Sequence, residues 1–89
     1  MEIEERIKRL LISSLEMSPA ALDGVGPRTP LFGRGLGLDS VEALALVTAI
    51  EQDFRITVDD AEFTADLLQD LATLADFVRR KTASDEGPP

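Results

Sequence analysis

Residues 35–44 read Gly-Leu-Gly-Leu-Asp-Ser-Val-Glu-Ala-Leu, and they join a glycine-rich connection to a run of apolar residues. Asp39 is a favourable N-cap residue, and Glu42 follows three positions later, which is the spacing of a capping box. An apolar pattern of helical period begins directly after this pair. The stretch therefore predicts a helix that begins at Ser40, behind a glycine-rich loop.

The predicted helix, residues 40–54, has two apolar faces. One face holds the residues that we expect in the core: Ala43, Leu46, Val47, Ile50 and Phe54. The opposite face carries few charges and contains Val41, Leu44, Ala45 and Thr48. A surface helix is normally polar on that side, so we expect the second face to be covered by another element or to dock a partner.

Three further helical segments are predicted around this helix. Residues 2–16 repeat Ile and Leu at helical spacing, with charged residues on the other side. A third helix is expected around residues 60–70, and a fourth begins near Thr73, which can cap it. The pattern leaves open whether these two helices are separate or form one bent rod.

A long connection from about residue 19 to 38 separates the first two helices. It is rich in Gly and Pro and contains the apolar residues that would anchor it to the core: Leu22, Leu31, Phe32, Leu36 and Leu38. A loop this long in a small domain is unusual unless it is functional or packed by its own side chains. The predicted fold class is all-α: a small four-helix bundle with a long loop between helices 1 and 2.

Composition limits the classes of function. The 89 residues suit one small domain, predicted at 1–82, with a disordered tail at 83–89. The 17 acidic and 9 basic residues give a net charge of −8, which disfavours nucleic acid and anionic membrane surfaces and favours partners with basic patches. No cysteine is present, so disulfides and thiolate metal sites are excluded.

The ends of the chain carry no targeting signal that we recognise. Residues 1–5 lack the basic and apolar parts of a signal peptide, and no apolar run is long enough to span a bilayer. We therefore expect a cytoplasmic monomer. The start at Met1 and the short polar tail favour a free-standing protein.

Three roles are open to Ser40. It can be a small polar residue in the first turn of a capped helix, with no further function. Catalysis is disfavoured, because a serine nucleophile needs a base and the chain has no histidine. No catalytic or metal-binding residue is predicted, and the protein is not expected to be an enzyme. The third role is a modification site, because a phosphodiester added by another enzyme would lie near free N–H groups of the helix.

The motif at residues 37–44, Gly-Leu-Asp-Ser-Val-Glu-Ala-Leu, resembles that of the acyl carrier protein family. These proteins are small acidic four-helix bundles, and their Asp-Ser-Leu motif at the start of the second helix is the attachment site for 4′-phosphopantetheine. The resemblance covers residues 2 to about 81 and includes Pro30-Leu31-Phe32, Phe54 and Thr73-Leu74. It implies that a phosphopantetheinyl transferase attaches the group to Ser40 from coenzyme A with Mg²⁺. Asp39 would cap the helix and help to orient the metal of the transferase.

The resemblance also implies a function. The chain would hold acyl intermediates as thioesters on the 4′-phosphopantetheine arm and deliver them to enzymes of fatty-acid, polyketide or related specialised lipid synthesis. Its partners would be the transferase and acyl-loading and acyl-processing enzymes with basic or apolar docking patches. The docking surface would consist of Val41, Glu42, Leu44, Ala45, Thr48 and Glu51.

Two departures from the family pattern shape this expectation. Val41 stands where leucine is usual, and Ala45 stands where an acidic docking residue is usual. We therefore expect a carrier dedicated to a specialised pathway. Two alternatives stay open: a peptidyl or aryl carrier of nonribosomal synthesis, and an unmodified acidic adaptor that binds a protein partner directly.

Overall fold

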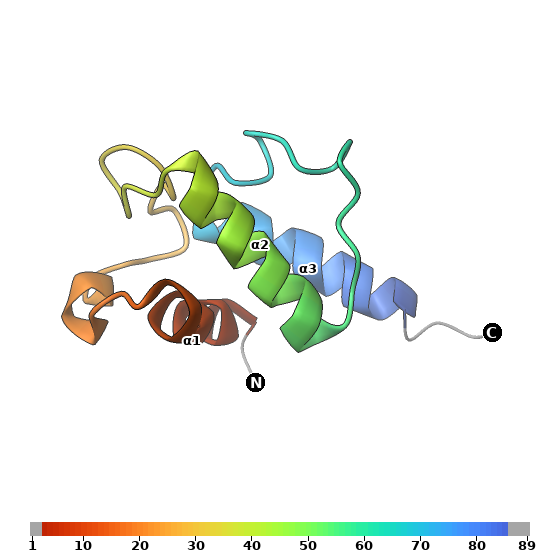
Figure 1. The fold of residues 1–89 in the computed structure, drawn as a ribbon, viewed down its shortest axis with the longest axis horizontal. Coiled ribbons are helices and arrows are strands. Elements are labelled where there is room, and N and C mark those ends of the chain that lie inside the picture. The colour runs from red at the N-terminus through yellow and green to blue at the C-terminus, as the bar shows by residue number, and fades with distance from the viewer. Residues whose placement is uncertain (1–2, 86–89) are drawn as a thin grey trace.

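The computed structural model describes residues 3–85, which fold into three α-helices and one short 3-10 helix. The elements are α1 (Ile3–Leu15), η1 (Pro19–Leu22), α2 (Ser40–Phe54) and α3 (Leu71–Asp85). In the view of Figure 1, α2 passes in front of α3, and α1 packs against both. The all-α prediction is confirmed, and α2 has the predicted bounds.

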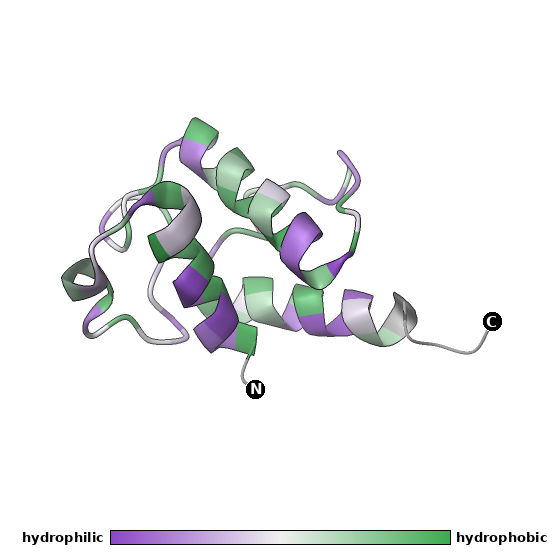
Figure 2. Ribbon diagram, turned by 60° about the horizontal axis from the view of Figure 1, so that its bottom comes forward, coloured by the Kyte–Doolittle hydropathy of each residue, from purple (hydrophilic) through white to green (hydrophobic). Residues whose placement is uncertain are grey.

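The core is formed by one face of each α-helix together with residues from the two long connections. Figure 2 shows hydrophobic residues along the surfaces where the helices approach one another. Four of the five residues predicted for the inner face of α2 are buried: Ala43, Leu46, Val47 and Ile50. The fifth, Phe54, is only partly buried and packs against the core at the end of the helix. The largest fully buried side chains are Ile7, Leu11, Leu31, Leu46, Ile50, Leu71, Leu74 and Val78.

The helix predicted around residues 60–70 is not an α-helix in the structure, and the fourth helical element is instead η1. Residues 59–69 form a series of turns, in which the Thr64 hydroxyl accepts a hydrogen bond from the backbone N–H of Leu67. Short polar side chains such as Thr and Asp compete in this way with the helical hydrogen-bond pattern. Leu67 and Leu68 are nevertheless buried, so this segment contributes to the core without being an α-helix.

The last helix begins two residues before the predicted start at Thr73 and is capped by another residue. The Asp70 carboxylate accepts a hydrogen bond from the backbone N–H of Thr73 at 2.8 Å, and its carbonyl accepts from Leu74. Asp70 is therefore the N-cap of α3, and it is 5 % exposed. At the other end, α3 runs to Asp85, so the tail predicted at 83–89 overlaps its last turn. Residues 86–89 of that tail lie outside the described residues.

The connection from η1 to α2 is packed against the start of α3. The backbone N–H of Leu31 donates to Gln69, and that of Ala72 donates to Pro27. All five predicted anchors reach the core: Leu22, Leu31 and Leu38 are buried, and Phe32 and Leu36 are partly buried against it. The length of this loop is thus explained by its own packing, as the sequence suggests.

Gly35 allows the tightest approach within this connection. A Cβ atom on Gly35 would lie 1.8 Å from the carbonyl oxygen of Pro30, which is backbone and cannot rotate away. The same oxygen accepts a hydrogen bond from the N–H of Leu36 at 2.9 Å. The loop therefore closes on itself at a position where any side chain is excluded.

We predict that Gly35→Ala lowers the free energy of unfolding by about 2–3 kcal/mol, because the methyl group forces the loop apart. Gly26→Ala is the matched control, since a Cβ there meets nothing within 4 Å and Gly26 does not have a positive φ. We expect this control to be neutral or to stabilise the fold by roughly 0.5 kcal/mol. Urea unfolding measures both, and equal effects of the two substitutions would contradict the close approach at Pro30.

The cap at Asp70 predicts a pH dependence. The hydrogen bond from Thr73, helped by the charge of Arg28, holds the pKa of Asp70 below its ordinary value of 3.8. A lowered pKa in the folded state means that the unfolded chain binds the proton more tightly. The stabilisation by the charge is therefore complete above pH 5 and is lost as the pH falls below about 4.

Asp70→Asn keeps an oxygen acceptor for Thr73 but removes this titration. We expect the stability difference between the wild type and Asp70→Asn to be constant near neutral pH and to shrink below about pH 4. Asp70→Ala also loses the acceptor and should cost about 1 kcal/mol at pH 7. Urea unfolding at a series of pH values gives both results. A wild type to Asp70→Asn difference that is unchanged down to pH 3 would show that the pKa of Asp70 is not lowered.

Candidate functional site

The N-terminus of α2 contains the capping box that the sequence predicts. The Asp39 carboxylate accepts a hydrogen bond from the backbone N–H of Glu42 at 2.7 Å. In return, the Glu42 carboxylate accepts from the N–H of Asp39 at 3.0 Å. Ser40 is the first residue of α2, directly behind this box, and it is exposed. Both hydrogen bonds tie the helix start to the preceding loop.

The loop in turn determines where Ser40 lies. Leu38, two residues before it, is buried, and its N–H donates to the carbonyl of Leu31 at 2.9 Å. Gly37 adopts a φ of +70°, a conformation that glycine adopts without strain. Ser40 is therefore held at the edge of a packed loop, which presents its side chain outward at a defined position.

The electrostatics around Ser40 suit an attached phosphodiester. The first N–H groups of a helix have no partner within the helix and carry partial positive charge. Among the hydrogen bonds of the described residues, none involves the N–H groups of Ser40 and Val41 or the Ser40 hydroxyl. These groups can approach a phosphate oxygen. The carboxylates of Asp39 and Glu42 lie near the same point, and each accepts one hydrogen bond of the capping box.

A hollow of about 200 Å³ opens beside Ser40. It lies where α2, the loop before it and the segment of turns after it meet, and most of its exposed lining is apolar. Its lining residues are Phe32, Ser40, Ala43, Phe63, Thr64, Ala65 and Leu68. The lining residues outside α2 could not be assigned to this hollow from the sequence, because they come from two segments that are far apart in the chain.

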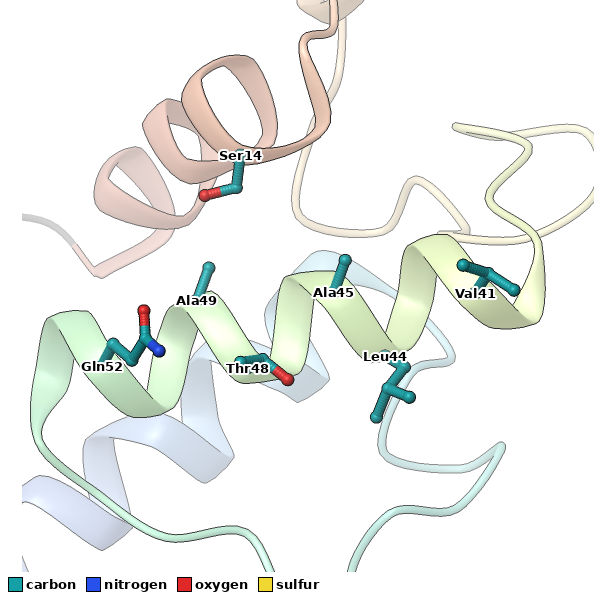
Figure 3. A pocket seen from close by; sticks show the side chains of 7 residues that line it. All are labelled: Ser14, Val41, Leu44, Ala45, Thr48, Ala49 and Gln52. Carbon is teal, nitrogen blue, oxygen red and sulfur yellow. The ribbon is translucent and has the colours of Figure 1, made fainter.

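The second apolar face of α2 is exposed. Val41 is 76 % exposed and Leu44 is 54 % exposed, whereas the other large hydrophobic residues in the described part of the chain are buried or partly buried. A shallow groove runs along this face towards α1, as Figure 3 shows. Its lining combines predicted docking residues with three that the prediction missed: Ser14, Ala49 and Gln52. Ala49 could have been predicted, because it lies four residues after Ala45 and therefore on the same face of α2. Ser14 could not, because it lies on α1.

The two acidic residues of the predicted docking surface are directed elsewhere. Glu42 takes part in the capping box, as described. The Glu51 carboxylate accepts a hydrogen bond from the backbone N–H of Val58 at 2.8 Å, and Glu51 is only partly exposed. Neither residue lines the groove. The structure thus brings Val41, Leu44, Ala45 and Thr48 together and places Glu42 and Glu51 outside that group.

Between residues 3 and 85, no helix is long and apolar enough to cross a membrane.

Two comparisons with known proteins agree with this geometry. Residues 5–80 match the family described as "Phosphopantetheine attachment site". The chain is also similar to a protein of Thermosynechococcus vestitus named "Acyl carrier protein". The two are 29 % identical over 83 residues, which cover 93 % of this chain and 95 % of the relative. The helical fold, the exposed serine at a capped helix start and the family match agree, and the chain belongs to the acyl carrier protein family, whose cofactor is covalent 4′-phosphopantetheine.

Proposed function

We propose that Ser40 is the residue that carries 4′-phosphopantetheine. The observation that supports this assignment best is the exposed position of Ser40 at the first residue of α2, beside unpaired N–H groups of the described helix start. The side-chain oxygen of Ser40 would form the new bond to phosphorus while the pyrophosphate bond of coenzyme A breaks. Adenosine 3′,5′-bisphosphate leaves, and the hydroxyl proton passes to the transferase. When bound, the group supplies a thiol that holds acyl chains as thioesters.

The residues around Ser40 divide the work of holding this group. The N–H groups of Ser40 and Val41 would face the phosphate, and the positive end of the α2 dipole would favour its charge. The apolar hollow beside Ser40 offers a surface on which an arm or its cargo can rest. Asp39 keeps the helix start in place through the capping box and would help to orient the metal ion of the transferase. This chain itself performs no chemical step.

The proposed role is that of a carrier in a specialised acyl pathway. Fatty-acid, polyketide and related lipid synthesis all use such carriers. The exposed apolar face at Val41, Leu44 and Ala45 favours partners that dock through an apolar surface over partners that dock through a basic patch. The partners would be a phosphopantetheinyl transferase and enzymes that load and process the acyl group. Tethering raises the effective concentration of that group at each partner.

An unmodified adaptor is the second candidate, and the same exposed face supports it. An adaptor would bind its partner through Val41 and Leu44 and would need no group on Ser40. The two candidates differ in whether Ser40 is modified, so a single experiment separates them.

We predict that incubation with a broad-specificity phosphopantetheinyl transferase, coenzyme A and Mg²⁺ adds the mass of one phosphopantetheinyl group. Ser40→Ala should abolish the addition, because the accepting oxygen is lost. Ser13→Ala is the matched control, since Ser13 is also exposed on a helix, does not line the groove and should leave the addition intact. Intact-protein mass spectrometry measures all three. An unmodified wild type with an intact fold would support the adaptor.

A second prediction separates the two roles of Asp39. Asp39→Asn keeps an acceptor for the N–H of Glu42, so we expect a loss of less than about 0.5 kcal/mol in stability. Asp39→Ala loses the acceptor and should cost about 1 kcal/mol. If the carboxylate helps to orient the metal of the transferase, Asp39→Asn should slow modification by at least about tenfold. Unchanged modification of Asp39→Asn would restrict Asp39 to its capping role.

A further inference from the structure

The segment between α2 and α3 covers one side of the hollow beside Ser40. We call residues 59–69 of this segment the strap, and Figure 1 shows them as part of an irregular arch between the two helices. The hollow has seven lining residues, and four of them belong to the strap: Phe63, Thr64, Ala65 and Leu68. The position of the strap therefore determines how widely the hollow opens and how accessible Ala43 of α2 is beneath it.

Both ends of the strap are anchored to neighbouring elements. Next to its start, the N–H of Val58 donates to the Glu51 carboxylate of α2 at 2.8 Å. At its end, the carbonyl of Gln69 accepts a hydrogen bond from the N–H of Leu31 at 3.4 Å. These contacts hold the two ends in place, so any opening of the strap must occur in its middle, at residues 59–66.

The middle of the strap has one polar contact with another element of the described chain. Its hydrogen bonds within residues 3–85 join residues of the strap to one another, as from the Leu67 N–H to the Thr64 hydroxyl. The exception is the ion pair between the Glu62 carboxylate and the Lys81 ammonium of α3, with an N···O distance of 3.0 Å. This ion pair is thus the point at which polar contacts tie the middle of the strap to α3.

Lys81 is the positive charge that faces an acidic segment. The middle of the strap has four acidic residues and no basic one: Asp59, Asp60, Glu62 and Asp66. The Lys81 ammonium also lies 5.7 Å from the centre of the Phe77 ring, which favours its position on this side of α3. The N–H of Asp59 and the ammonium of Lys81 hold the pKa of Glu62 below its ordinary value of 4.5, so both partners are charged at neutral pH.

The ion pair is accessible to solvent and can be broken without unfolding the helices. The side chains of Lys81 and Glu62 are 27 % and 33 % exposed, so water and salt ions reach both charges. Ion pairs of this kind contribute little to stability, and salt weakens them. Glu62 is adjacent to Phe63, which lines the hollow and is only partly buried. Breaking the pair therefore frees the part of the strap that closes the hollow.

We propose that the Glu62–Lys81 ion pair is a latch on the hollow beside Ser40: the strap covers the hollow while the pair is formed and opens when it breaks, with the three helices still folded. Local opening of this kind is favoured where few contacts must be lost. Salt, or an ion that competes for either charge, would then expose the hollow. The latch belongs to the unmodified chain, so this inference does not rest on the proposed function.

A single cysteine can measure the opening, because the chain has no cysteine of its own. Ala43→Cys places a thiol on α2 where the side chain lines the hollow and is 1 % exposed. Ala75→Cys is the reference, since Ala75 is also buried, at 0 % exposure, but lies in α3 and does not line the hollow. The rate of reaction with an excess of a thiol-specific reagent reports how often each thiol becomes accessible.

We expect the thiol of Ala43→Cys to react at least about tenfold faster than that of Ala75→Cys, because local opening is more frequent than global unfolding. Low concentrations of urea should change the first rate little and raise the second steeply, since global unfolding exposes far more surface. Adding Lys81→Gln to Ala43→Cys should raise its rate by about two- to fivefold at low salt, and Glu62→Gln should have the same effect.

A matched control and a double variant isolate the ion pair. Arg79→Gln removes the same charge from α3, but Arg79 pairs with Asp76 of its own helix, so the rate should not change. Lys81→Gln together with Glu62→Gln should raise the rate no more than either substitution alone, because both break the same contact. At about 500 mM NaCl, each effect should shrink because salt already weakens the pair in the parent protein.

An unchanged rate with Lys81→Gln or Glu62→Gln would overturn the proposal, as would equal urea dependence of the two thiols. The second result would mean that the hollow opens only when the bundle unfolds. Hydrogen exchange of the Leu67 N–H, compared with that of Val47 in α2, repeats the comparison without a cysteine and applies even if a thiol variant does not fold. None of these measurements involves modification of Ser40, which decides the proposed function separately.

Discussion

The packing of the α1–α2 connection against the start of α3 is the constraint on which the rest of the structure depends. Leu31 and Pro27 bond to the backbone at Gln69 and Ala72, and Gly35 lets the chain fold back onto Pro30. These contacts join segments about 40 residues apart in the sequence. They hold the residues before α2 in place, so the helix begins at a defined point and Ser40 is exposed there.

The capping box connects this architecture to function. Asp39 and Glu42 satisfy two N–H groups at the helix start and leave those of Ser40 and Val41 open to solvent. The two carboxylates nearest to Ser40 thus stabilise the start of the helix on which it lies. The groove along α2 is nevertheless lined by uncharged residues, although the chain is strongly acidic.

Features that depend on neighbouring residues could be predicted from the sequence. The bounds of α2, its capping box and its buried face follow from propensity and period alone, and the anchors of the long loop follow from their hydrophobicity. The resemblance of residues 37–44 to a carrier motif then identified the family. The exposed second face of α2 was recognised as unusual because its apolar residues lack charged neighbours.

Features that depend on distant contacts could not be predicted. The turns at residues 59–69 bury Leu67 and Leu68, whose spacing in the sequence also suits a helix. Side-chain hydrogen bonds such as that of Thr64 favour the turns over the helix. Glu62 bonds to Asp59 and to Lys81 of α3, which ties the segment across the fold. Three further features depend on residues that are distant in the sequence, and the sequence alone does not reveal them. They are the burial of the cap residue Asp70, the close approach of Gly35 to Pro30 and the place of Ser14 in the groove beside α2.

The central claim is that the phosphopantetheinyl group is joined to Ser40, and peptide mapping tests it most directly. Trypsin cleaves after Arg34 and Arg55, and the peptide of residues 35–55 contains Ser40 as its one serine. After incubation with the transferase and coenzyme A, fragmentation of this peptide should place the added mass on Ser40. Added mass on another peptide, or on Thr48 of this one, would contradict the account.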